Sequence, residues 1–161
     1  MKPHFRSLAL GALILVAVAV RCDKPPASRP EGRGPHVVVL GSSTAHGWGP
    51  AHAESAWVDR FRRAAQAVDP GRSVTNLAWP GYTTYHLMPD GFPPPDGRPA
   101  PDTARNISQA VRLGADAIII NLPSNDAIHG WSVETQLANY ESMLAAAQEL
   151  SLGVSFDCRM I

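Results

Sequence analysis

The sequence is poor in the features that mark several large classes of protein. Its 161 residues include only two cysteines, Cys22 and Cys158, which carry little information about a disulfide framework. The 14 basic residues equal the 14 acidic residues in number, so no surplus of positive charge favours a nucleic-acid partner. No cluster of Cys, His, Asp and Glu has metal-ligand spacing, and no glycine-rich loop carries the lysine of a nucleotide-binding loop. The sequence therefore predicts a protein without a metal, another cofactor or a nucleic-acid partner.

The sequence also lacks an apolar run of membrane-spanning length. Leu8–Val20 is uncharged over 13 residues, whereas a spanning helix needs roughly 20. The run follows two basic residues and ends in Ala17-Val18-Ala19, a small-x-small cleavage pattern, so residues 1–22 are predicted to be a signal peptide. Cys22 also allows a lipoprotein leader with membrane attachment through the acylated cysteine, although Arg21 is a poor residue for that processing site. We expect export to the cell envelope or the extracellular space; a leader read from a misplaced start codon is the alternative.

Residues 23–35 contain four prolines and no apolar periodicity, which predicts a flexible linker. The domain is expected to occupy residues 36–161, where short apolar runs alternate with helical patterns. The proline-rich stretch 89–101 can form neither a helix nor an interior strand. Strands are expected at 37–41, 72–81, 115–123 and from 153, and helices at 54–71, from 102 or 103 to 114, and at 132–153.

This alternation predicts an α/β domain with a parallel sheet in strand order 2-1-3-4, because strand–helix–strand crossovers are right-handed and the order reverses between strands one and three. The last helix has the clearest pattern, with Ser132 as a candidate cap. Its predicted buried stripe consists of Val133, Leu137, Tyr140, Leu144 and Ala147.

Three polar loops follow the first three predicted strands. Ligands bind outside the carboxyl ends of parallel strands, where such loops converge. The first loop contains Ser43, the second contains Gly81 and the third contains Asn125. A hydroxyl nucleophile, a backbone N–H and an amide N–H are the groups that acyl transfer requires, since the two donors stabilise the oxyanion that forms when the hydroxyl attacks a carbonyl.

The stretches "VVLGSST", "AWPGYTT" and "LPSND" resemble the first three sequence blocks of the SGNH (GDSL-type) hydrolases. The resemblance implies a flavodoxin-like three-layer α/β/α fold and a serine esterase, with an acylated carbohydrate as one substrate class. It implies Ser43 as the nucleophile that forms an acyl-Ser43 intermediate. The Ser43 backbone N–H, Gly81 and Asn125 are implied as the oxyanion hole. Two positions depart from the family pattern: Ser42 replaces the usual aspartate, and Pro123 replaces the usual glycine.

The family's fourth block, an Asp-x-x-His motif that supplies the catalytic histidine and its orienting aspartate, is not found between Gly130 and Ile161. We therefore expect a C-terminally truncated domain that lacks its fifth strand and has little or no esterase activity, because a serine without a base is a weak nucleophile. Only His46, His86 and His129 are near the loops, and an exposed loop position is the default for each.

Other interpretations stay open at this point. Ser43 could be an ordinary turn residue, and Asn125 could belong to a simple cap or turn. Trp48, Trp79 and Trp131 could stack on a sugar ring or be buried under loops. The main alternative function is a non-catalytic module that binds a glycan or a protein in the same cleft, and a nucleotide-binding domain is a weaker one.

Overall fold

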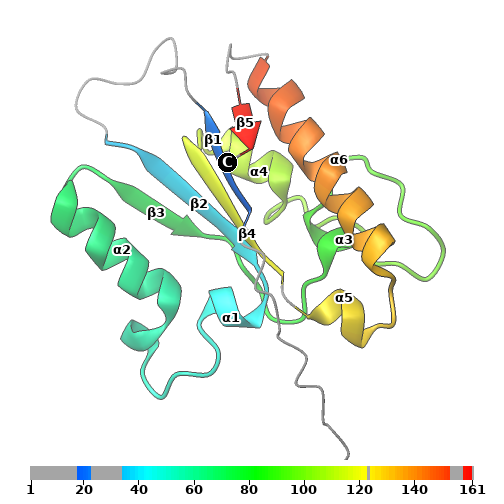
Figure 1. Ribbon diagram of the computed structural model, residues 1–161, viewed down its shortest axis with the longest axis horizontal. Coiled ribbons are helices and arrows are strands. Elements are labelled where there is room, and N and C mark those ends of the chain that lie inside the picture. Colours follow the sequence, from blue (N-terminus) through cyan, green and yellow to red (C-terminus); the bar gives the residue numbers. More distant parts are fainter. Residues whose placement is uncertain (1–17, 23–33, 123, 153–157, 161) are drawn as a thin grey trace, which may run out of the picture.

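The computed structural model describes residues 18–22, 34–122, 124–152 and 158–160, and its centre is a sheet (Figure 1). The strands are β1 (Val18–Cys22), β2 (His36–Gly41), β3 (Ser73–Asn76), β4 (Ala117–Asn121) and β5 (Cys158–Met160). Their order across the sheet is β3-β2-β4-β1-β5.

The three central strands have the predicted order and direction. β2 pairs in parallel with β3 on one side and with β4 on the other, and Val39 is the register partner of both Asn76 and Ile119. The predicted parallel order 2-1-3 is therefore confirmed. It arises because β2 is the switch point at which successive connections run to opposite sides.

The fourth position differs from the prediction of a parallel strand in order 2-1-3-4. The strand beside β4 is β1, which runs antiparallel to it with Val18 opposite Ile120. This apolar stretch from the predicted leader pairs with backbone groups that would otherwise form an open sheet edge. The segment expected to supply the fourth strand, 153–156, lies outside the described residues.

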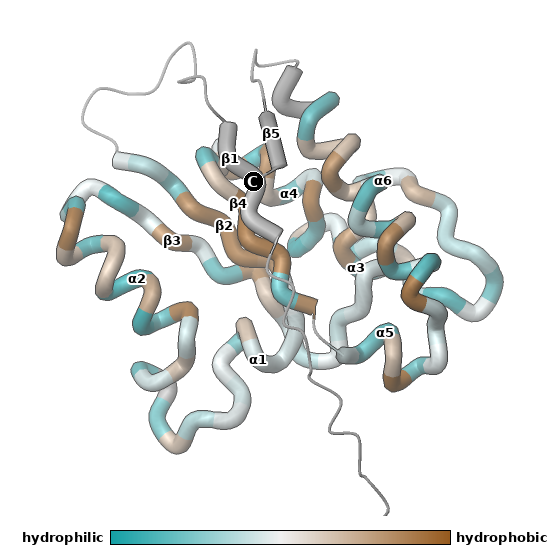
Figure 2. The backbone as a smooth tube through the Cα atoms, in the orientation of Figure 1, coloured by the Kyte–Doolittle hydropathy of each residue, from teal (hydrophilic) through white to brown (hydrophobic). Residues whose placement is uncertain are grey.

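The side chains of the central strands alternate between two hydrophobic cores, which is why these strands are continuous apolar runs. Val38 belongs to a core with α4 (Ile107–Arg112) and α6 (Val133–Leu152). Val39 belongs to a core with α2 (Trp57–Val68). Figure 2 shows the resulting band of hydrophobic residues along β2 and β4 in the middle of the molecule. Helices thus cover both faces of the sheet.

Two helices begin later than predicted. A 3-10 turn at Ala53–Ser55 precedes α2, which begins at Trp57. α4 begins at Ile107 because the Asn106 side chain caps it, accepting a hydrogen bond from the Gln109 N–H at 3.0 Å.

The last helix begins where the sequence predicts, and it buries part of the predicted stripe. The Ser132 hydroxyl accepts a hydrogen bond from the Thr135 N–H at 3.2 Å, as expected of a cap. Ala147 is buried and Tyr140 packs against the core, as predicted.

The first two members of the stripe, Val133 and Leu137, are instead 63% and 56% exposed. Asn139 and Met143 are buried, and they lead to Ala147 in successive i+4 steps. The buried face in this part of the helix is therefore rotated toward Asn139.

The proline-rich stretch 89–101 contains neither helix nor strand, as predicted. It follows the short helix α3 (Thr84–Leu87) and leads to α4. No helix among the described residues combines the length and the apolar character needed to cross a membrane.

Candidate active site

The candidate site lies where β2, β3 and β4 end. β2 continues into the short helix α1 (Ser43–His46), and β4 leads to the short helix α5 (Asn125–Ile128). Figure 1 shows α1 and α5 at the same end of the sheet. The loop after β3 carries Gly81 and leads to α3. Parallel strands bring these three segments together because they all end at one edge of the sheet.

Ser43 is the first residue of α1, and the sheet itself fixes its position. The buried Ser42 donates its N–H to the Asn121 carbonyl at 3.2 Å, which continues the pairing of β2 with β4. A Cβ on Gly41 would lie 2.6 Å from that same carbonyl oxygen, so only glycine fits there. Ser43 is only partly buried, and among the described residues no side chain is hydrogen-bonded to its hydroxyl. Its N–H, in the first turn of a helix, also has no internal partner.

Gly81 takes a backbone conformation that favours glycine. Its φ is 83°, in the left-handed region. A Cβ at this position would meet no atom within 4 Å, so the conformation of the turn, rather than crowding by the protein, calls for glycine here. The exposed Gly81 N–H has no hydrogen-bond partner among the described residues. This leaves a backbone donor accessible from solvent beside α1.

Asn125 connects the third loop to the second. Its side-chain amide donates a hydrogen bond to the Tyr82 carbonyl at 2.7 Å, next to Gly81 in the chain. The first and second loops are joined in the same way, because the Trp79 N–H donates to the Gly41 carbonyl at 3.1 Å. All three loops with predicted site residues are therefore connected by hydrogen bonds. Whether Ser43, Gly81 and Asn125 carry out the predicted roles stays a prediction.

A buried polar network begins at the residue after Asn125 and supports the loop that carries it. The next residue, Asp126, is 1% exposed, and its carboxylate accepts hydrogen bonds from both the N–H and the hydroxyl of Thr84. The Thr84 hydroxyl in turn accepts from the Asn139 amide at 2.7 Å. The network joins α3, α5 and α6. It also explains why the polar Asn139 lies on the buried face of its helix.

Sequence reasoning did not identify Thr84, Asn139 or Asn76 as supporting residues. The Asn76 amide donates to the Ala45 carbonyl at 2.7 Å, and its oxygen accepts from the Ala78 N–H at 3.1 Å. Asn76 thus positions α1 against the loop that carries Gly81. The one sequence signal for Asn76 is that a polar residue ends a strand. This signal does not indicate which groups the side chain binds, because Ala45, for example, is distant in sequence.

The three nearby histidines differ in their surroundings. His86 accepts a hydrogen bond from the Thr83 N–H at its Nδ1, as part of a capping box, and burial lowers its pKa from the ordinary value. His46 and His129 are exposed and contact tryptophan rings, His46 edge-on to Trp79 and His129 stacked on Trp131. No hydrogen bond among the described residues connects Ser43 to any of them.

An Asp-x-x-His spacing does occur at Asp126 and His129. The Asp126 carboxylate is directed to Thr84, and among the contacts of described residues there is no hydrogen bond between Asp126 and His129. The spacing therefore does not form the aspartate–histidine pair of a catalytic triad. No group of three or more His, Cys, Asp or Glu residues in the described part of the chain has an arrangement that could hold a metal ion.

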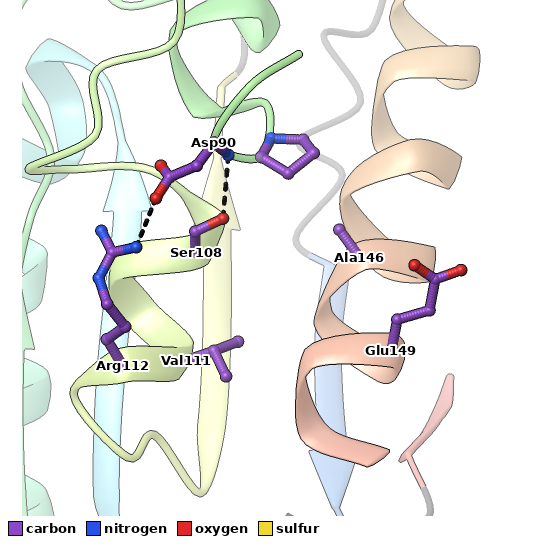
Figure 3. A pocket seen from close by; sticks show the side chains of 7 residues that line it. Asp90, Ser108, Val111, Arg112, Ala146 and Glu149 are labelled. Atoms are coloured by element: carbon purple, nitrogen blue, oxygen red, sulfur yellow. Dashed lines mark hydrogen bonds and ion pairs between the residues drawn. The ribbon is translucent and has the colours of Figure 1, made fainter. Parts of the chain in front are cut away.

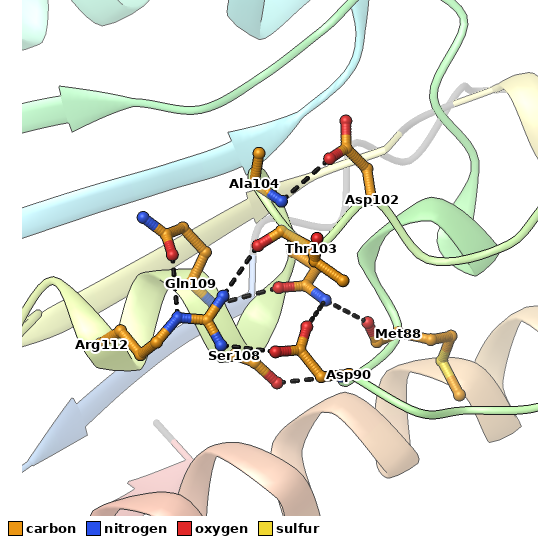
Figure 4. Close-up of polar contacts among 9 residues, drawn as sticks. Met88, Asp90, Asp102, Thr103, Ala104, Ser108, Gln109 and Arg112 are labelled. Atoms are coloured by element: carbon orange, nitrogen blue, oxygen red, sulfur yellow. Dashed lines mark hydrogen bonds and ion pairs between the residues drawn. The ribbon is translucent and has the colours of Figure 1, made fainter.

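A groove between α4 and α6, the α4–α6 groove, has a volume of about 650 Å³ (Figure 3). It is lined by Pro89, Asp90, Ser108, Val111, Arg112, Ala146 and Glu149. Most of its polar groups bind one another, as Figure 4 shows: Arg112 pairs with Asp90 and donates to the Thr103 carbonyl at 2.8 Å. The groove does not contain any of the predicted site residues.

Comparisons with known proteins agree with this arrangement. Residues 39–158 match the sequence model of the GDSL-like Lipase/Acylhydrolase family. Among solved structures, the chain is similar to the psychrotrophic esterase EstA from Pseudoalteromonas sp., in a structure inhibited by monoethylphosphonate, with 17% identity and a TM-score of 0.54. The alignment covers 73% of this chain and 55% of the esterase chain, so this chain spans about half of the esterase's length.

At that identity the structural likeness concerns the fold alone. A search of the curated proteins finds no match. The family match, however, extends over most of the sequence and includes the strands and loops of the candidate site. The chain therefore belongs to the GDSL-like lipase/acylhydrolase family.

Proposed function

We propose that this protein is a serine acylhydrolase that cleaves an acyl ester through an acyl-Ser43 intermediate. The main supporting observation is the connection of three loops at one sheet end, with the Ser43 hydroxyl and two N–H donors left without protein partners. Membership of a family of ester-bond hydrolases supports the same reaction class. An acylated carbohydrate is the proposed substrate type, since Trp79 is 46% exposed and can stack on a sugar ring.

In the proposed reaction, the Ser43 oxygen attacks the ester carbonyl carbon and the carbonyl oxygen becomes an oxyanion. The Ser43 N–H, the Gly81 N–H and the second amide hydrogen of Asn125 stabilise that charge. The alcohol leaves with a proton, and water then releases the acid from the acyl-serine. A base must accept the Ser43 proton, and none is hydrogen-bonded to it among the described residues, so we expect slow turnover by the 161-residue chain.

A reactive phosphonate probe tests the nucleophile directly. The esterase of similar fold is inhibited by monoethylphosphonate, which suggests an ethyl phosphonate with a good leaving group as the reagent. We expect slow but selective modification of Ser43, because the proposed oxyanion-hole donors assist the attack even without a hydrogen-bonded base. Peptide mass spectrometry locates the modified residue. Ser42→Ala is the matched control, because it removes a neighbouring hydroxyl that is buried, and it should leave the labelling of Ser43 in place. Equal labelling of Ser43 and an exposed serine such as Ser132 would instead favour the non-catalytic binding module.

We also propose that the protein is exported. Cleavage after Ala19 would remove the first two residues of β1, whereas lipoprotein processing would leave Cys22 as the first residue. Sequencing the N-terminus of the protein from fractionated cells separates the two, with expected starts at Val20 or Cys22. An intact Met1 in the cytoplasmic fraction would contradict export.

A further inference from the structure

Arg105 lies beside the candidate site and has no acidic partner. Its guanidinium carbon is 4.4 Å from the centre of the Trp79 ring. Its one hydrogen bond among the described residues goes to the Leu77 carbonyl at 3.4 Å. No carboxylate of the described part of the chain forms an ion pair with it. A half-buried guanidinium has five N–H donors, so most of those on Arg105 are available to a ligand.

The position of Trp79 places this cation next to the proposed reaction centre. Trp79 is two residues before Gly81 and donates its N–H to the Gly41 carbonyl. The His46 ring contacts Trp79 edge-on, with 5.4 Å between ring centres. His46 is three residues after Ser43 on α1, and residues at that spacing are neighbours on a helix surface. The Trp79 ring therefore contacts both the helix that carries the proposed nucleophile and the guanidinium of Arg105.

Two other arginines of the same region show why Arg105 stands out. Arg112 has a carboxylate partner in Asp90, and it also donates hydrogen bonds to Gln109 and to the Thr103 carbonyl. Arg98 lies 4.4 Å from the centre of the Trp131 ring, but that ring is also contacted by Tyr85 and His129. Trp79 by contrast remains 46% exposed beneath Arg105, so a ligand can reach both groups together.

The carboxylates of Asp102 and Asp126 have hydrogen-bond partners other than Arg105. Asp102, three residues earlier, accepts hydrogen bonds from the Tyr82 hydroxyl and the Ala104 N–H. Asp126 is buried against Thr84. A guanidinium held on an aromatic face, in reach of solvent and without a counter-ion, is suited to an anionic oxygen group such as a carboxylate, sulfate or phosphate.

We propose that Arg105 and Trp79 form a specificity subsite for esters whose leaving alcohol carries a negative charge near the scissile bond. Trp79 stacks on the ring or carbon frame of that alcohol, and Arg105 pairs with its anionic group. The assignment rests on the proposed function in one respect only, which is that the scissile carbonyl is bound at Ser43.

Binding of two product-like phenols tests the subsite without catalysis. 4-Hydroxybenzenesulfonate and 4-hydroxybenzenesulfonamide share one aromatic frame and differ in charge. We expect the Ser43→Ala chain to bind the sulfonate about five- to tenfold more tightly in an NMR titration, because a charged hydrogen bond is added. Arg105→Gln should remove this preference, and Arg105→Lys should keep part of it. Arg60→Gln removes an exposed arginine on α2 whose side chain has no hydrogen bond or ion pair among the described residues, and it should leave the preference unchanged.

The salt dependence of the sulfonate preference distinguishes direct ion pairing from a purely structural role of Arg105, because a structural role would not make the preference depend on salt. The preference of the wild-type chain should shrink at high ionic strength, while sulfonamide binding stays constant. Equal affinity for the two phenols, or a preference that persists in a folded Arg105→Gln protein, would overturn the subsite. A clear preference together with no phosphonate labelling of Ser43 would support the subsite and refute the esterase. Thermal melts identify any variant that has unfolded, and Arg105→Lys then provides the comparison.

Discussion

The α4–α6 groove and the end of β2, β3 and β4 differ in how their polar groups are paired. In the groove, Arg112 pairs with Asp90, as Figure 4 shows. The neighbouring Asn106 donates to the same carboxylate at 2.7 Å. At the sheet end, the Ser43 hydroxyl and most donors of Arg105 have no partner among the described residues. Unpaired polar groups are therefore found at the sheet end rather than in the groove.

The difference indicates what each region does for the protein. Satisfied polar groups contribute to stability, and unpaired groups that solvent can reach are available to a substrate. Substitutions at the sheet end should therefore change reactivity, and substitutions in the groove should change stability only.

The largest expected effect comes from supplying a base at the sheet end. Fusing a segment with an Asp-x-x-His motif from a longer family member should raise hydrolysis of a short-chain p-nitrophenyl ester by about 10²- to 10⁴-fold, the usual contribution of a general base. Ser43→Ala should abolish that gain, and Glu149→Gln in the groove should leave it intact. Turnover at enzyme-like rates by the 161-residue chain alone would mean that His46, His86 or His129 is the base, and single His→Gln substitutions would identify it.

Removal of one oxyanion donor should have the next largest effect. Asn125→Ala should lower the rate of phosphonate labelling at Ser43 by about 10²- to 10³-fold, since the amide acts only as charge develops on the oxygen. Arg112→Gln is the groove counterpart and should label at the wild-type rate. Unchanged labelling of a folded Asn125→Ala protein would remove Asn125 from the oxyanion hole.

Substitution of two buried residues, Asp126 at the sheet end and Asn106 near the groove, should distinguish a loss of stability from a loss of Ser43 reactivity. Asp126→Ala leaves the Thr84 donors unpaired and should lower the unfolding free energy by about 2–3 kcal/mol, with slower labelling of Ser43. Asn106→Ala removes the cap of α4 and should cost about 1–2 kcal/mol with no change in labelling. Urea unfolding and labelling rates measured side by side decide this. Slower labelling in Asn106→Ala would show that the two regions are coupled.

The smallest effect concerns the pH dependence of stability in the groove. Hydrogen bonds from Asn106 and then from Arg112 lower the pKa of Asp90 below its ordinary value. The unfolded chain therefore binds the proton more readily, so this carboxylate stabilises the fold above its unfolded pKa and loses that effect as the pH falls through the folded pKa. Asp90→Asn should cost less than about 1 kcal/mol at neutral pH, because the pair is partly exposed.

The cost of Asp90→Asn should vanish in acid, once the pH has fallen below the folded pKa of Asp90. Asp96→Asn, which makes the same charge change at an exposed loop position, is the control and should show little cost at either pH. An equal cost for Asp90→Asn at both pH values would contradict the electrostatic origin.

The sequence was most informative where one physical preference dominates. Continuous apolar runs such as residues 37–40 predicted the central strands, because a strand buried on both faces has no polar side. The three loops followed from the rule for parallel sheets, which brings the segments of Ser43 and Asn125 to one end. The stripe predicted on α6 was wrong in its first two members, because apolar Val133 and Leu137 are exposed while polar Asn139 is buried. The partners that decide this are distant in sequence.

Ser42, the residue before the proposed nucleophile, is paired with the sheet through its backbone amide. Because the Ser42 amide is bonded to the Asn121 carbonyl, its hydrogen can exchange with solvent only when β2 and β4 separate. We therefore expect this amide hydrogen to exchange no faster than the pairing of β2 with β4 opens, which ties the turn that presents Ser43 to the centre of the sheet.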